Sequence, residues 1–100
     1  MKKLEIEFKG KTVMITGAAG HVGTALSEAY GQSCAEELIL TDIPDKKTKL
    51  EEMADHLSRT FKNIKIRIYC ADLTDMHDIM QMTEKIRREA CGVDVLVNNA

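Results

Sequence analysis

The amino-acid sequence predicts an α/β fold built around a doubly wound parallel sheet. Two hydrophobic periods alternate along the 100 residues. Short, continuous apolar runs are typical of buried strands, and longer segments with apolar residues at every third or fourth position are typical of helices. Strands that alternate with helices form a parallel sheet with helices on both faces. The predicted order of elements is therefore β-α-β-α-β-α-β.

The first half of the chain contains two predicted strands and two predicted helices. Residues 12–16 (TVMIT) and 37–42 (ELILTD) are short and apolar, as buried strands are. The helix between them has an apolar face that consists of Val22, Ala25, Leu26, Ala29 and Tyr30. Pro44 and Asp45 predict a turn and the start of a second helix. The apolar face of this helix consists of Leu50, Met53, Ala54, Leu57 and Phe61.

The second half adds two strands and one helix. Residues 64–70 (IKIRIYC) alternate strictly, which predicts a strand with one solvated face at an edge of the sheet. Thr74 or Asp75 can cap the third helix, and Gly92 can end it. Its apolar face consists of Met76, Ile79, Met80, Thr83, Ile86 and Ala90. Residues 93–100 (VDVLVNNA) form the fourth strand.

The rules for connecting parallel strands predict how these elements are arranged. Right-handed crossovers, with a reversal of direction after the third strand, give the strand order 3-2-1-4. This order places the alternating strand at one edge. The fourth strand then has a partner on one side only, and we expect apolar surface to be exposed there.

Composition and charge exclude several kinds of partner. The net charge is −2, so neither nucleic acid nor an anionic membrane surface is an expected partner. No apolar stretch approaches the roughly 20 residues that span a bilayer. The lysines at the start are not followed by the apolar region of a signal peptide. We therefore expect a cytoplasmic protein.

The three cysteines are widely spaced and include no CxxC pair. Cys34, Cys70 and Cys91 are therefore expected to be reduced thiols, at least two of them buried like small apolar side chains. The spacing of ligands typical of a metal site is absent as well. We expect no metal site.

Three glycines occupy the turn between the first strand and the first helix. A backbone without side chains at this place can hold a phosphate against the unpaired N–H groups of the helix N-terminus. Gly17 would permit the tight turn, Gly20 the close approach of phosphates, and Gly23 the close packing of helix and strand. A plain tight turn can also use glycine, and the G-x-x-G-x-x-G spacing differs from the commoner G-x-G-x-x-G.

Asp42 ends the second strand, nineteen positions after Gly23. A carboxylate at that distance can accept hydrogen bonds from the ribose hydroxyls of a dinucleotide and would repel a 2′-phosphate, which favours NAD over NADP. Alternatively, Asp42 is a turn or cap residue. Lys46 and Lys47 could reach a phosphate and weaken the preference for NAD, or lie on a solvated helix face.

Four features in this order resemble the short-chain dehydrogenase/reductase superfamily: TGAAGHVG (16–23), Asp42, CADLTD (70–75) and VDVLVNNA. The resemblance spans essentially the whole chain and implies the N-terminal, Rossmann-type NAD(P)-binding portion of such an enzyme. The cofactor-binding residues that it implies are Gly17, Ala18, Ala19, Gly20, His21, Val22, Gly23, Asp42, Ile43, Asp72, Leu73, Asn98, Asn99 and Ala100.

The resemblance also implies roles for these residues. Asp42 and Ile43 would face the adenine ribose, Asp72 would bond the adenine amino group, and Leu73 would meet the ring through its backbone. The NNA segment, 98–100, would support the central strand beside the nicotinamide ribose. Alternatively, Asp72 is a turn or cap residue, and the asparagines form a turn at the end of the strand.

Two departures from the family pattern concern the branch and the chemistry. The loop spacing is that of the epimerase-like branch, whereas NNA is typical of the ketoreductase-like branch. The catalytic tyrosine of the family has a lysine four residues later. Here Tyr30 and Tyr69 are followed at that distance by Cys34 and Leu73. We therefore expect no catalytic residue in residues 1–100, which would form a single, partial dinucleotide-binding domain without the catalytic C-terminal half.

The function implied by the resemblance is hydride transfer between NAD, or less readily NADP, and a small carbonyl or alcohol substrate. The full-length enzyme is expected to be a homo-oligomer, and the 100-residue chain alone is expected to be inactive. Three alternatives are a non-catalytic NAD-binding module, an epimerase- or dehydratase-like member acting on nucleotide sugars, and a methyltransferase-type sheet that binds S-adenosylmethionine. The phosphate-shaped loop counts against the last.

Overall fold

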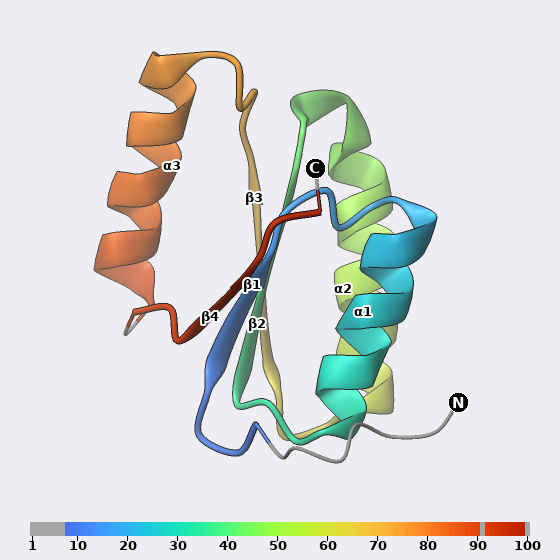
Figure 1. Cartoon of the computed structure of the whole chain (residues 1–100). Coiled ribbons are helices and arrows are strands. Elements are labelled where there is room, and N and C mark those ends of the chain that lie inside the picture. The colour runs from blue at the N-terminus through green and yellow to red at the C-terminus, as the bar shows by residue number, and fades with distance from the viewer. Residues whose placement is uncertain (1–7, 91, 100) are drawn as a thin grey trace.

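The computed structural model describes residues 8–90 and 92–99. Strands and helices alternate in it as predicted (Figure 1). The elements in chain order are β1 (Thr12–Ile15), α1 (His21–Gln32), β2 (Glu37–Asp42), the short 3₁₀ helix η1 (Pro44–Lys46), α2 (Lys47–Thr60), β3 (Lys65–Cys70), α3 (Met76–Glu89) and β4 (Val95–Val97).

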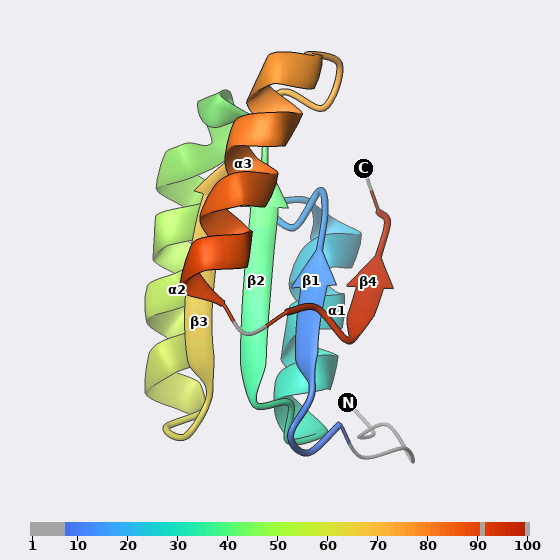
Figure 2. The ribbon, with the colours of Figure 1, turned by 90° about the vertical axis from the view of Figure 1, so that its left-hand side faces the viewer.

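The four strands form one parallel sheet with the order β3-β2-β1-β4, which confirms the predicted fold class and topology. Figure 2 shows the strands side by side, with α3 in front of the sheet and α1 and α2 behind it. The central strand is β1, in which Ile15 pairs with Leu40 of β2 and with Val97 of β4. Strand β1 therefore lies between β2, which ends at Asp42, and β4, which ends just before Asn98.

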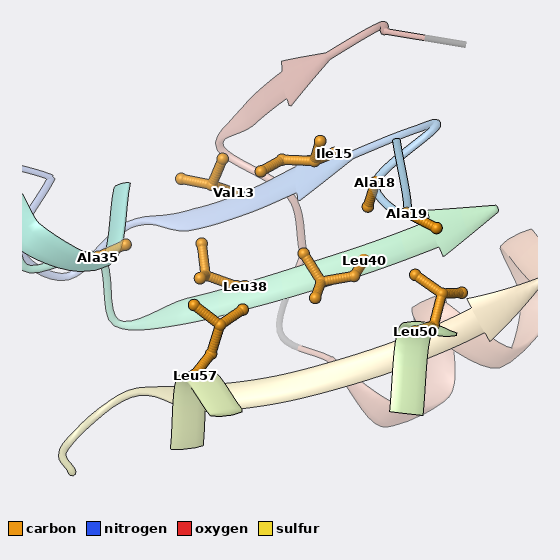
Figure 3. Packing of buried hydrophobic residues seen from close by; sticks show 9 residues of the cluster. All are labelled: Val13, Ile15, Ala18, Ala19, Ala35, Leu38, Leu40, Leu50 and Leu57. Carbon is orange, nitrogen blue, oxygen red and sulfur yellow. The ribbon is translucent and has the colours of Figure 1, made fainter. Parts of the chain in front are cut away.

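The main core lies between the sheet and the two helices α1 and α2. Figure 3 shows that Leu38 and Leu40 of β2 lie beside Leu57 and Leu50 of α2, and that Val13 of β1 belongs to the same cluster. All five side chains are buried. Each side chain of this size stabilises the fold by about 1.5–3 kcal/mol when it is fully buried. A smaller cluster under α3 consists of Ile39, Ala71, Met82 and Ile86.

Helix α1 packs through the predicted face only in part. Ala29 is buried and Leu26 and Tyr30 pack against the core as predicted. Val22 is 61% exposed and Ala25 is exposed too, whereas Gly23, Ser27 and Gly31 are buried. These small residues recur every four positions and let the helix backbone approach its neighbours closely. A Cβ atom at Gly31 would lie 2.5 Å from the ring of Phe61. The hydrophobicity pattern did not identify these three residues because glycine and serine contribute little to it.

Helix α3 also differs from the prediction. Met76 and Met80 are 69% and 64% exposed, while Met82 and Ile86 face the sheet. With 3.6 residues per turn, Met80 is rotated about 200° from Met82, so the two cannot share a buried face. The helix ends at Glu89, three residues before Gly92, which adopts a φ of +119° in the turn that follows.

The polar face of β3 is partly covered rather than fully solvated. Arg67 pairs with the buried carboxylate of Glu37, and the Tyr69 hydroxyl donates to Glu89 of α3 at 2.7 Å. Burial and the Glu89 carboxylate raise the pKa of Tyr69 to about 12. The edge position of β3 is nevertheless as predicted.

The expectation of at least two buried cysteines is wrong for the two that the structure describes. Cys34 is exposed and Cys70 is half-buried. Burial raises the pKa of the Cys70 thiol, which favours its protonated form. Cys91 lies outside the described residues.

Candidate cofactor-binding site

The predicted site residues come together at one end of the sheet. Because all strands are parallel, their carboxyl ends meet at the same edge, which lies at the top of Figure 1. The glycine loop after β1, Asp42 at the end of β2, Asp72 after β3 and Asn98 after β4 all lie there. Ala100 lies outside the described residues.

The loop after β1 turns sharply and is fastened to β2. Gly17 adopts a φ of +61°, a left-handed conformation that glycine tolerates best. The N–H of Ala18 donates to the Thr41 carbonyl at 3.0 Å, and the N–H of Gly20 donates to the Gly17 carbonyl at 3.3 Å. The side chains of Ala18 and Ala19 are buried. These two alanines therefore fasten the loop to the core.

The start of α1 presents hydrogen-bond donors that the helix itself cannot use. The first intrahelical bond to the loop runs from the Thr24 N–H to the Gly20 carbonyl, at 2.9 Å. For the backbone N–H groups of His21, Val22 and Gly23, no acceptor lies among residues 8–90 and 92–99. Together with the positive end of the helix dipole, such groups attract an anion.

The two glycines that flank this helix start meet different surroundings. A Cβ atom at Gly23 would lie 2.5 Å from the Gly17 carbonyl oxygen and 2.6 Å from the Ala18 Cα atom. A Cβ atom at Gly20 would meet only the Gly17 carbonyl oxygen, at 3.6 Å, which is an ordinary contact. Packing within the protein therefore requires glycine at position 23 but not at position 20.

Asp42 connects the second strand to the glycine loop. Its Oδ2 atom accepts the N–H of Ala19 at 3.0 Å, and its Oδ1 atom accepts the N–H of Ile43 at 2.8 Å. The bond to Ile43 is the local contact of a turn residue. The bond to Ala19 spans 23 positions of sequence and brings the carboxylate beside the loop.

Thr16 joins the ends of the two strands β1 and β4, a role that the sequence analysis did not assign. Its hydroxyl donates to the Asn98 side-chain oxygen at 3.1 Å and accepts the Asn99 N–H at 3.0 Å. The Asn99 side chain donates to the Gly17 carbonyl at 3.3 Å. The two asparagines are thus tied to the first turn of the glycine loop. In the sequence, this role of Thr16 was indicated only by the position of its hydroxyl group, directly before a glycine at the end of a strand.

Asp72 forms a local turn. Its Oδ1 atom accepts both the N–H and the hydroxyl of Thr74, at 2.9 and 2.7 Å. These bonds lower the pKa of the Asp72 carboxyl group. Leu73 beside it is partly exposed, as is Ile43 after Asp42. The cap of α3 is Asp75, which accepts the N–H of His77 at 2.9 Å.

A family model for short chain dehydrogenases matches residues 11–100, so it includes every predicted site residue. The chain belongs to the short-chain dehydrogenase family. This is a family of oxidoreductases.

Individual short-chain dehydrogenases resemble the chain over most of its length. A sorbose reductase of Candida albicans is 27% identical over 92% of the chain and 31% of the relative. A fatty acyl-CoA reductase of Acinetobacter baylyi is 31% identical over 99% of the chain and 33% of the relative. The crystal structure of L-sorbose reductase from Gluconobacter frateurii, complexed with NADPH and L-sorbose, superposes with a TM-score of 0.84. It is 25% identical, and the match covers 97% of the chain and 35% of that structure.

The chain thus spans about a third of the length of these short-chain dehydrogenases. In the part of the chain that the structure describes, no helix is both long and apolar enough to cross a membrane. Within the same residues, no group of three or more His, Cys, Asp or Glu side chains could hold a metal ion.

Proposed function

We propose that this chain binds the NAD(P) cofactor of a short-chain oxidoreductase at the carboxyl edge of its sheet. The pyrophosphate would lie at the N-terminus of α1 and the adenosine ribose at Asp42. Asp72 and Leu73 would meet the adenine, and Asn98 and Asn99 the nicotinamide side. The observation that carries this proposal is the set of three consecutive N–H groups, at positions 21–23, without an acceptor among the described residues.

The residues present fit a dinucleotide. Gly20 is exposed, and a Cβ atom there would meet only the Gly17 carbonyl oxygen, so the proposed phosphates could come close to the backbone at this position. The carboxylate of Asp42 stands at the same edge as an acceptor for hydroxyl groups. When bound, the cofactor supplies or accepts the hydride. The chain's own residues bind it and fix its orientation.

We also propose that residues 1–100 form the cofactor half of the enzyme and that its catalytic acid lies elsewhere. Tyr30 packs edge-on against Phe8, with ring centroids 4.9 Å apart, and Tyr69 is bonded to Glu89. Neither tyrosine has a lysine four residues later. The substrate of the whole protein would be a small carbonyl or alcohol compound.

NAD is the proposed cofactor because Asp42 would repel a 2′-phosphate at the adenosine ribose. The L-sorbose reductase with a similar fold was crystallised with NADPH, so the preference needs a direct test. Titration of the purified protein by calorimetry would compare NADH, NADPH and S-adenosylmethionine. We expect NADH to bind more tightly than NADPH, and S-adenosylmethionine not to bind.

Two outcomes would contradict the proposal in different ways. If folded protein, checked by circular dichroism, bound neither nicotinamide cofactor, the proposed site would be wrong. If NADPH bound more tightly than NADH, only the assignment of the ribose contact to Asp42 would be wrong.

A further inference from the structure

We propose that Asp42 is a positioning residue for the glycine loop, in addition to being the residue that contacts the ribose. The inference rests on the proposed function, since it concerns the same cofactor site. It follows from the direction of one hydrogen bond, in which the loop donates to the side chain at the end of β2.

Two consecutive N–H groups attach the loop to β2. The first, of Ala18, donates to the backbone carbonyl of Thr41, and any residue at position 41 would supply that acceptor. The second, of Ala19, donates to the Oδ2 atom of Asp42 at 3.0 Å. This second attachment therefore depends on the identity of a side chain. Ala19 is 2% exposed, and removal of the carboxylate would leave its N–H without the acceptor that it has in the folded protein.

The carboxylate can hold the loop and a ribose at the same time. An ionised carboxyl group has about four acceptor positions on its two oxygen atoms. The bonds to Ala19 and Ile43 use one position on each oxygen. One position on each remains for a hydroxyl group. Asp42 would therefore keep the loop in place while it selects the cofactor.

The two roles of Asp42 can be told apart by the affinity for ligands that lack the ribose hydroxyls. If Asp42 only contacts the ribose, its replacement would not affect a ligand without those hydroxyls. If Asp42 also shapes the loop, its replacement would weaken such a ligand too, because the phosphates would meet a less ordered helix start. Removal of a negative charge alone would act in the opposite direction and strengthen the binding of an anion.

The test compares ADP with 2′,3′-dideoxy-ADP by calorimetry, on the wild-type protein and on Asp42→Ala. We expect Asp42→Ala to weaken the binding of dideoxy-ADP about tenfold, the equivalent of one charge-assisted hydrogen bond. Asp45→Ala is the matched control, because it removes the same charge from an exposed position nearby. It should leave the affinity for dideoxy-ADP unchanged or slightly higher.

A second readout needs no ligand. Hydrogen exchange at the Ala19 amide should become faster in Asp42→Ala, while the amides of core residues such as Leu40 stay protected. Unchanged exchange at Ala19, or undiminished binding of dideoxy-ADP, would overturn the positioning role. If wild-type protein bound no ADP at all, the proposed function would fail instead, and the exchange experiment would still report on the loop.

Discussion

At the scale of single residues, the two glycines at positions 20 and 23 predict opposite consequences of the same substitution. Gly23→Ala should destabilise the fold by about 1–3 kcal/mol, since its Cβ atom would be forced against the backbone of Gly17 and Ala18. Gly20→Ala should leave the fold nearly unchanged but weaken the binding of NADH, because its Cβ atom meets little protein and would take up space proposed for the phosphates. Urea denaturation and NADH titration of both variants would measure this contrast.

Each glycine variant serves as the other's control. A strongly destabilised Gly20→Ala would show that the loop is packed more tightly than its 3.6 Å contact indicates. A Gly23→Ala variant with wild-type stability would show that the helix can shift away from the strand at little cost.

Replacement of Cys34 by glycine is expected to stabilise the fold. It follows the end of α1 with a φ of +66°, and the bonds from the Cys34 and Ala35 N–H groups to Gly31 and Tyr30 form a helix-terminating motif that usually has glycine here. Cys34→Gly should raise the free energy of unfolding by about 0.5–1 kcal/mol, after the higher entropy of unfolded glycine is subtracted. Cys34→Ala keeps the strained backbone, so in urea denaturation it should match the wild type.

Because of Tyr69, we expect the stability of the fold to fall under alkaline conditions. Its pKa is raised from 10.0 to about 12 in the folded protein, so the folded state favours the neutral phenol. The resulting stability is fully present below pH 10 and is lost as the pH rises toward about 12. Tyr69→Phe should therefore lose less stability than the wild type between these values. Urea denaturation of both proteins at several alkaline pH values would test this, and parallel losses would contradict it.

At the scale of elements, two residues at the start of α3, Thr74 and Asp75, were candidates for its cap. Asp75→Ala should cost about 1 kcal/mol, since Asp75 accepts the N–H groups of His77 and Asp78. Thr74→Ala should cost less than about 0.5 kcal/mol, as is usual for an exposed side chain outside the cap. Thermal unfolding would rank the two variants. The reverse order would show that the Thr74–Asp72 turn, rather than the cap, stabilises this end of the helix.

The second strand and the core of the sheet could be predicted from the sequence because burial there selects large apolar side chains. ELILTD corresponds residue for residue to β2. The fourth strand was predicted too long, since among the described residues of 93–100 only the short segment Val95–Val97 forms a strand. The buried faces of α1 and α3 could not be predicted as well. Helix α1 buries Gly23, Ser27 and Gly31 in addition to the predicted Ala29, and α3 buries Met82 in addition to the predicted Ile86. Hydrophobic periodicity does not identify small residues that permit a close approach, nor does it rank one methionine above another.

At the scale of the whole molecule, parallel topology explains why the candidate site residues could be placed at one edge of the sheet from sequence. Once the strand order is known, the carboxyl ends of β1, β2 and β4 must meet at one edge. The hydrogen bonds within that edge could not be predicted. Those of Thr16 to the asparagines and of Ala19 to Asp42 join residues 23 to 83 positions apart in the chain. Their partners become clear only in three dimensions.

We also expect the chain as a whole to bind the cofactor without catalysing a reaction. The purified 100-residue chain should bind NADH but should not reduce a carbonyl compound such as L-sorbose. Its two tyrosines are engaged with Phe8 and Glu89, and neither has a lysine four residues later. Absorbance of NADH during incubation with a panel of carbonyl compounds would measure turnover. Oxidation of NADH that depends on substrate would show that a residue of this chain supplies the proton.

The central position of β1 has a practical consequence for engineering. The glycine loop follows β1, and two side chains anchor it: Asp42 at the end of β2 and Asn99 in the segment after β4. A graft that exchanged residues 16–23 alone would arrive without its two anchors. Anyone who wishes to transplant the glycine loop of this protein into another scaffold should move 16–23, 41–43 and 97–99 as a single module.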